Sequence, residues 1–393
     1  MSNDSSPAYE EELDSSSAAV DAAPETGAEG GSRGKGLRTA AVSAAAVLAV
    51  AVGVGTYVGT QGHSAATSKT ASSSAKHAVS LAAASGGTAY EAYVASSGGY
   101  EIATLNTQTG AAGPTYSTDS AMGVALAPNN QTLYVANTGQ YGVLAYNLST
   151  GKATTIQVGA YPKDIAVAPN GNHVYATVTG GDTGPGGSNQ VAVINAAVNK
   201  LSGNITVGSA PRRIVLSADG TRAYVGTDQG IYVINTSTNR VVGVVQAPTD
   251  VQGLALSHNG GTLYATAPDE GKVLVISTRS LSVQHTFQAG AEPWSVGVSL
   301  DDTKLYVADT NSNSVAVIDA KSGKTLTSIT VGSLPTALGV TPDGSEVWVG
   351  NTLTGSLSVI STATNTLAAT IPGGPGTSAL DSAPTEVIFG PAS

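Results

Sequence analysis

Residues 332–361 read GSLPTALGVTPDGSEVWVGNTLTGSLSVIS, and this stretch decides the fold. It holds three short runs rich in Val, Leu and other apolar residues, with a Pro-Asp-Gly turn at residues 342–344 between the first two. Asp-Gly supplies the positive φ that a tight hairpin needs, and short apolar runs bounded by such turns are typical of antiparallel strands. The stretch therefore predicts a unit of consecutive, hairpin-connected strands.

The same unit recurs from residue 88 onward. Each copy carries one aromatic anchor in its second strand: Tyr93, Tyr134, Tyr175, Tyr224, Tyr264, Tyr306 and Trp348. Successive anchors lie 41, 41, 49, 40, 42 and 42 residues apart. Third and fourth apolar runs follow most anchors, and four short strands per repeat of about forty residues is the pattern of a β-propeller blade. The sequence predicts an all-β, seven-bladed β-propeller.

The two ends of the repeat region complement one another. The first copy opens at its second strand, around Tyr93, and the missing first strand stands at residues 383–391, which align with residues 210–216. We therefore predict that one blade is built from both ends, so that a C-terminal strand completes the first blade and closes the ring.

The repeat resembles the YVTN β-propeller family, whose signature is G-x-x-P, a strand, P-D-G, Y-V-T-N and then V-x-V-I-D. The matching residues here are Gly332, Pro335, the turn at 342–344, VWVGN at 347–351 and VIS at 359–361. The resemblance covers residues 88–391 and implies a propeller of the kind found in exported and surface-layer proteins. Because the signature residues are structural, it implies no particular activity.

The N-terminal part predicts export. Residues 40–58 form an uncharged apolar run long enough for one bilayer crossing, and Arg33, Lys35 and Arg38 precede it. The predicted organisation is a disordered acidic cytoplasmic tail (1–38), a transmembrane signal-anchor (39–59), a flexible Ser/Ala/Thr linker (60–87) and the propeller (88–393), with the C-terminal domain outside the cell membrane. The alternative is a signal peptide cleaved near residues 64–66, which secretes the rest.

Composition excludes several function classes. The chain has no cysteine, so disulfides and thiolate chemistry are absent. Its net charge is −10 with only 11% charged residues, which argues against nucleic-acid binding. We predict no cofactor.

Three candidate chemical sites favour structural explanations. Asp319 occupies a slot that elsewhere holds Asn or Ser, residues that cap turns through backbone N–H groups. Asp309 opens a calcium-like DTNSN run that lacks the sixth-position glycine and the twelfth-position glutamate. His173, His258 and His285 show no metal-ligand spacing. We predict no catalytic constellation and no metal site.

The residues that break the repeat favour a binding site instead. The first inner-strand positions of a propeller lie at the mouth of its central channel, and here they differ from blade to blade. One ring is Met122, Lys163, Arg212, Gln252, Trp294, Thr336 and Thr385, and the next is Gly123, Asp164, Arg213, Gly253, Ser295, Ala337 and Glu386. We predict a ligand site formed by Lys163, Asp164, Arg212, Arg213, Trp294 and Glu386, suited to an anionic group or a sugar ring. The alternative is that the arginines pair with Asp164 and Glu386 and only order the mouth.

One loop is longer than its counterparts. Residues 179–189 insert about eight extra residues after the third anchor, and insertions in repeat proteins tend to gather on the binding face. We predict either a lip of the mouth or a tolerated loop without a role.

The function predicted from these patterns is a non-enzymatic cell-surface binding scaffold for a protein or an envelope glycan. The alternatives are a propeller enzyme, such as a lactonase-like hydrolase or lyase, and a structural protein of an envelope layer.

Overall fold

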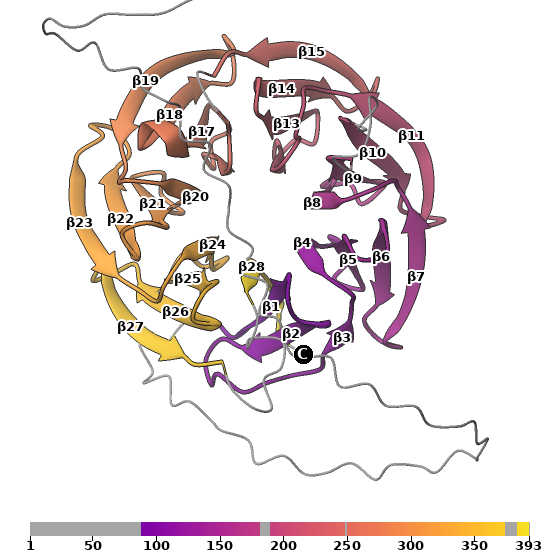
Figure 1. Ribbon diagram of the computed structural model, residues 1–393, viewed down its shortest axis with the longest axis horizontal. Coiled ribbons are helices and arrows are strands. Elements are labelled where there is room, and N and C mark those ends of the chain that lie inside the picture. Colours follow the sequence, from indigo (N-terminus) through magenta and orange to yellow (C-terminus); the bar gives the residue numbers. More distant parts are fainter. Residues whose placement is uncertain (1–87, 181–188, 248–249, 374–382, 393) are drawn as a thin grey trace, which may run out of the picture. The chain divides into compact units, whose positions relative to one another are not determined.

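The computed structural model describes residues 88–180, 189–247, 250–373 and 383–392. These residues form seven four-stranded antiparallel sheets around a central axis, which confirms the predicted all-β, seven-bladed propeller (Figure 1). We number the sheets as blades 1 to 7 along the chain. Within the described ranges the only helix is the 3-10 turn η1 (Pro268–Glu270).

The strands of each blade are given from the channel outward. Blade 1 contains β28 (Pro384–Pro391), β1 (Tyr90–Ser96), β2 (Glu101–Asn106) and β3 (Tyr116–Ser117). Blade 2 contains β4 (Ala121–Leu126), β5 (Thr132–Asn137), β6 (Gly142–Asn147) and β7 (Lys152–Gln157). Blade 3 contains β8 (Pro162–Val167), β9 (His173–Val178), β10 (Gln190–Asn195) and β11 (Lys200–Thr206). Blade 4 contains β12 (Ile214–Leu216), β13 (Arg222–Thr227), β14 (Gly230–Asn235) and β15 (Arg240–Val245). Blade 5 contains β16 (Leu254–Leu256), β17 (Thr262–Ala267), β18 (Lys272–Ser277) and β19 (Ser282–Gln288). Blade 6 contains β20 (Pro293–Val298), β21 (Lys304–Asp309), β22 (Ser314–Asp319) and β23 (Thr325–Thr330). Blade 7 contains β24 (Pro335–Val340), β25 (Glu346–Asn351), β26 (Ser356–Ser361) and β27 (Thr366–Ile371).

Blade 1 takes strands from both ends of the described chain. β28 pairs antiparallel with β1, from Tyr90 opposite Pro391 through Tyr93 opposite Ile388 to Ser96 opposite Pro384. β28 is the innermost strand of this sheet and lies between β24 and β4 in the ring (Figure 1).

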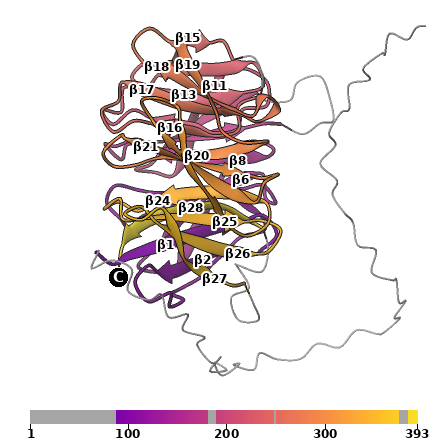
Figure 2. The ribbon, with the colours of Figure 1, turned by 90° about the vertical axis from the view of Figure 1, so that its left-hand side faces the viewer.

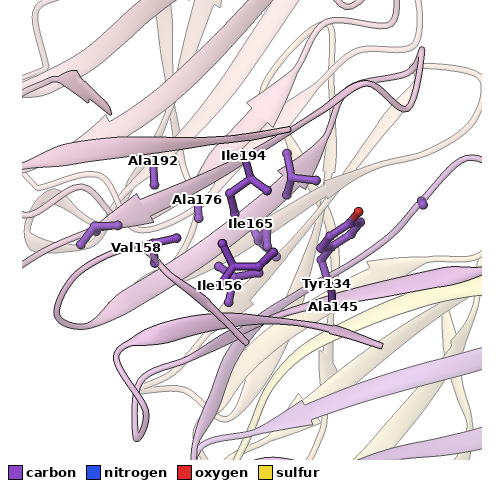
Figure 3. Close-up of a cluster of buried hydrophobic side chains, with 12 residues drawn as sticks. Tyr134, Ala145, Ile156, Val158, Ile165, Ala176, Ala192 and Ile194 are labelled. Carbon is purple, nitrogen blue, oxygen red and sulfur yellow. The ribbon is translucent and has the colours of Figure 1, made fainter. Parts of the chain in front are cut away.

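The hydrophobic core is divided among the interfaces between neighbouring blades. The second and third strands of each blade bury most of their side chains, the innermost strands bury or half-bury nearly all of theirs, and most outermost strands expose the majority. Each of seven buried clusters joins two adjacent blades. Figure 3 shows one, in which Tyr134 and Ile156 of blade 2 pack against Ile165 and Ile194 of blade 3. No blade has a core of its own, so the ring is the unit that folds.

Three of the seven aromatic anchors also bond to the next blade through their hydroxyl groups. The hydroxyl of Tyr175 donates to Asn239 Oδ1 at 3.1 Å, and Tyr134 and Tyr306 do the same with Asn199 at 3.0 Å and Asn365 at 3.2 Å. Each of these asparagines has a positive φ near 50°, a backbone conformation that Asn tolerates better than most residues. The repeated tyrosine therefore fills the core and ties its blade to the following one.

The two faces of the ring have different connections. The loops that precede each inner strand, and those between the second and third strands, lie on one side, which we call the mouth face. The hairpin turns between the first and second strands lie on the other, which we call the opposite face. β1 begins at Tyr90, beside the end of β28, so the chain enters the propeller at the opposite face. Figure 2 shows the ring of blades from the side.

Several sequence predictions fall outside the described residues. These are the tail, the membrane segment at 39–59, the linker and most of the inserted loop, residues 181–188. Among the residues that are described, no helix is long and apolar enough to span a bilayer.

Candidate functional site

The candidate residues stand at irregular starts of the inner strands. β8 pairs with β9 at Pro162 and again at Ile165, which leaves Lys163 and Asp164 outside the regular ladder. β4, β20 and β24 show similar register shifts at their first residues. Such bulges redirect side chains, and here they release the variable positions from sheet pairing.

Asp164, Arg213 and Glu386 meet in the channel although they come from blades 3, 4 and 1. Arg213 Nη1 lies 3.0 Å from Glu386 Oε1 and 3.7 Å from Asp164 Oδ1. Arg213 Nη2 also donates to the carbonyl oxygen of Thr385 at 3.4 Å. The three side chains are largely buried, with Asp164 the deepest. We call this group the channel triad.

Backbone amides complete the channel triad. Glu386 Oε2 accepts the N–H of Val124 in blade 2 at 3.0 Å. Asp164 accepts the N–H of Ile165 through Oδ1 and the N–H of Ile214 through Oδ2, each at 2.8 Å. The channel triad therefore connects blades 1, 2, 3 and 4. Its carboxyl oxygens also satisfy backbone N–H groups that would otherwise need water as a partner.

A glycine makes this meeting possible. Gly123 occupies the equivalent position in blade 2, between the strands that carry Glu386 and Asp164. A Cβ at residue 123 would lie 2.7 Å from Asp164 Cα, 2.9 Å from Asp164 Oδ1 and 3.0 Å from the carbonyl oxygen of Lys163. Only a residue without a side chain leaves this space open to the Asp164 carboxylate.

The two carboxyl groups of the channel triad hold their protons more tightly than usual. Burial, followed by the charge of nearby Asp164, raises the pKa of Glu386 to about 8, and Arg213 opposes this rise only in part. Burial also raises the pKa of Asp164, against the opposing effect of Arg213 and the two backbone N–H groups. Burial thus favours the neutral forms of both carboxyl groups, and the guanidinium of Arg213 favours their charged forms.

The neighbouring arginine is paired as well. Arg212 Nη2 lies 2.9 Å from Asp250 Oδ2, and Arg212 Nε donates to Asp250 Oδ1 at 3.0 Å. The side-chain amide of Gln252 donates to the same carboxylate. This bidentate pair presents a planar set of donors and acceptors at the mouth.

The structure brings together three of the six predicted residues. Asp164, Arg213 and Glu386 form the channel triad, whereas Arg212 pairs with Asp250, a loop residue outside the prediction. Lys163 and Trp294 are half-buried on the inner strands of blades 3 and 6. The pairing of Arg213 with Asp164 and Glu386 is the arrangement expected if these residues order the mouth.

Asp319 and Asp309 make hydrogen bonds to nearby backbone and side-chain groups. Asp319 Oδ1 accepts the N–H and hydroxyl of Ser322, at 2.7 and 2.6 Å, as a turn cap does. Asp309 accepts the N–H groups of Ala291 and Glu292, each at 2.9 Å, which tie it to the loop before β20. Among the described residues, no three His, Cys, Asp or Glu side chains lie close enough together to hold a metal ion.

The sequence analysis missed exposed side chains on the mouth face. Five large apolar residues are exposed in its loops: Tyr100, Tyr141, Tyr161, Leu334 and Leu353. Their blades, 7, 1, 2 and 3, are consecutive in the ring. Large exposed side chains gathered on one face are typical of binding surfaces.

Comparisons with known proteins show the fold alone. No family model matches the chain, and no curated protein matches it, so membership of the YVTN family stays a prediction. A solved structure titled Kuenenia stuttgartiensis hydrazine synthase is similar, with 19% sequence identity and a TM-score of 0.58. The match covers 68% of this chain and 88% of that one. The chain thus has a β-propeller fold that is also found in an enzyme of distant sequence.

Proposed function

We propose that this chain is a non-enzymatic binding scaffold whose propeller is displayed outside the cell and binds an envelope component, foremost a glycan, at its mouth face. One observation carries the proposal. The position that opens each inner strand holds a different side chain in nearly every blade, while the surrounding framework repeats. This ring consists of Met122, Lys163, Arg212, Gln252, Trp294, Thr336 and Thr385. Varied side chains on a repeated scaffold are typical of a site for an asymmetric ligand.

The charge balance at the mouth supports a neutral or weakly charged ligand. Arg212 pairs with Asp250, and Arg213 pairs with Asp164 and Glu386 in the channel triad, so neither arginine is left without an acidic partner. Trp294 adds an aromatic surface, and the Arg212–Asp250–Gln252 group adds planar hydrogen-bonding groups. Aromatic rings stack on the C–H faces of sugars while planar polar groups bond their hydroxyls, so a glycan suits this composition.

The engagement of the mouth carboxylates argues for binding rather than catalysis. Asp164 and Glu386 already accept backbone N–H groups and contact Arg213. A general acid or base must reach the reacting group of its substrate, and these contacts hold both side chains in the wall of the channel.

The direction of the chain supports display from a membrane anchor. Residue 88 lies at the opposite face, so the chain before it leaves the propeller on the side away from the mouth. We include in the proposal that β28 is the closing strand of the ring, which makes the C-terminal segment necessary for folding.

The test is recovery of envelope material by the full-length chain. We expect a glycan-containing fraction of the cell envelope to be retained by the parent and lost with Trp294→Ala. Leu300→Ala, at an exposed position of the opposite face, is the control and should retain it. Equal recovery by all three chains would contradict the mouth as the site, and hydrolysis of a lactone by the parent would favour the enzyme alternative.

A further inference from the structure

Tyr141 and Tyr161 form an exposed aromatic pair on the mouth face. Tyr141 lies in the loop between β5 and β6, and Tyr161 lies in the loop before β8, so the two rings come from different blades. Their centroids are 5.4 Å apart and their planes are inclined at 75°. Tyr141 is 48% exposed and Tyr161 is 39% exposed. The pair thus presents aromatic surface to solvent at a fixed angle.

The backbone at Tyr141 is unfavourable for tyrosine. Its φ is +56°, in the left-handed region, where a bulky side chain is rare. Blades 5, 6 and 7 have loops of the same four-residue length, and their last residues also have a positive φ. Those residues are Gly271, Asn313 and Gly355, the types that adopt this conformation most easily. Blade 2 alone among these four places a large side chain there.

Tyr161 also has a left-handed backbone conformation. Its φ is +55°, and it precedes Pro162. Ala210, Leu334 and Ala383 precede prolines in other blades with a positive φ between 46° and 58°. Two of these three are alanine, so the backbone does not require a large residue. Both tyrosines therefore combine a strained backbone with an exposed apolar surface, and neither feature contributes to folding.

The polar groups around the pair have balanced charge. Asp119 is exposed and stands against Gly139, because a Cβ at residue 139 would lie 2.5 Å from Asp119 Cβ. Lys163 follows Tyr161 by two residues, within the register shift at the start of β8. The two loops thus have one acidic and one basic residue close to them in the chain, which suits an uncharged polar ligand better than an acidic polymer or a basic peptide. Lys163 also belongs to the mouth ring, so the aromatic pair borders the mouth.

We propose that Tyr141 and Tyr161 form a stacking subsite for a sugar residue of a neutral glycan whose chain continues toward the channel mouth. This inference rests on the proposed function and deepens it. The apolar face of a pyranose ring packs on one tyrosine ring, and its hydroxyls remain available to polar groups of the mouth. The strain at both tyrosines is retained because a glycine or asparagine, although better suited to the backbone, offers no surface for the sugar.

The experiment measures binding of the full-length chain to chito-, cello- and malto-hexaose, with polygalacturonate as the acidic comparison, by isothermal titration calorimetry. The variants are Tyr141→Asn, which introduces the residue type of Asn313, and Tyr161→Ala, which introduces that of Ala210. Leu300→Ala is the control, because Leu300 is 50% exposed but lies on the opposite face, away from the proposed site.

We expect a neutral hexaose to bind the parent, and each tyrosine variant to bind at least ten-fold more weakly. Leu300→Ala should bind within two-fold of the parent. The melting temperature of Tyr141→Asn should equal or exceed that of the parent, which separates loss of a contact from loss of fold. Tyrosine variants that bind as the parent does would overturn the subsite while leaving the proposed function intact.

Two other results would also overturn the inference. One is tighter binding of polygalacturonate than of every neutral hexaose. The other is the absence of any hexaose binding by a parent chain that still recovers an envelope protein. A parent chain that recovers neither glycan nor protein would overturn the proposed function itself.

Discussion

Glu386 and Arg213 form an ion pair of 3.0 Å between blades 1 and 4, which are not neighbours in the ring. The interaction joins β28, near the C-terminus, to the start of an inner strand in the middle of the chain. It crosses blade 2 at Gly123 and blade 3 at Asp164. Four predictions follow from this pair and from the contacts between blades.

Replacing Gly123 by alanine should destabilise the propeller. The added methyl group would meet Asp164 Cα at 2.7 Å, which is backbone that has little room to move. Overpacking of this kind costs about 1–3 kcal/mol. Chemical denaturation measures the loss. Gly203→Ala is the control, because nothing lies within 4 Å of a Cβ there, and its stability should change by less than about 0.5 kcal/mol. Equal effects of the two substitutions would refute the close packing at residue 123.

Stability should fall as the pH rises from about 4.5 to about 8. Burial and Asp164 raise the pKa of Glu386 to about 8 in the folded protein, so the folded state binds a proton that the unfolded state releases near the ordinary value of 4.5. The unfolding free energy therefore decreases through this window, by an amount on the order of several kcal/mol, and levels off above it. Denaturation at a series of pH values measures the slope.

Glu386→Gln should remove most of that slope, because the amide does not titrate. Asp301→Asn should leave it unchanged, since hydrogen bonds from Ser299 and Thr303 hold the pKa of Asp301 at about 2, below the window. Retention of the full slope in Glu386→Gln would show that another group is responsible.

Tyr175→Phe should cost about 0.5–1.5 kcal/mol, the usual net contribution of one hydrogen bond. The substitution keeps the ring in the core and removes the bond to Asn239 Oδ1 at 3.1 Å, together with the longer one to the carbonyl oxygen of Thr236 at 3.4 Å, both in the next blade. Tyr224→Phe is the control, because Leu281, with φ +52°, occupies the corresponding position opposite it and offers no acceptor. Thermal melts compare the two, and an equal loss for both would mean that the bond between blades contributes nothing.

Removing residues 383–393 should abolish cooperative folding. β28 is the inner strand of blade 1, and Val387 is part of the core between blades 7 and 1. Its loss would also leave Arg213 without Glu386. Circular dichroism and gel filtration would detect an expanded or aggregated chain. A chain that lacks only residues 392–393 should melt as the parent does, and a compact 1–382 chain with an unchanged melting temperature would contradict the prediction.

The architecture could be predicted from the sequence because each blade corresponds to one sequence repeat. Seven phased aromatics and the turns with Asn-Gly or Asp-Gly determine where strands begin and end. The alignment of residues 383–391 with 210–216 also predicts the strand that pairs with β1. Blade 1 is the least regular: its outer strand β3 has only two residues, and no clear fourth run marks it in the sequence.

The site was less predictable, because its contacts join residues far apart in the chain. The sequence places Asp164, Arg213 and Glu386 at equivalent positions, but the gap that lets their side chains meet depends on Gly123 in an intervening blade. Asp250 was missed as the partner of Arg212 because it lies two residues before Gln252, outside the two ring positions at which the blades were compared. Tyr141 could have been found by aligning it with Gly271, Asn313 and Gly355, although the strain there depends on a backbone angle.

The position of residue 88 has a mechanical consequence. β1 begins at the opposite face and lies between β28 and β2, so a pull on the chain before residue 88 acts along the axis of β1. Hydrogen bonds perpendicular to that axis would be loaded together, in shear, instead of opening one at a time. A propeller held from this point would resist drag on its bound partner with both ladders of its first blade.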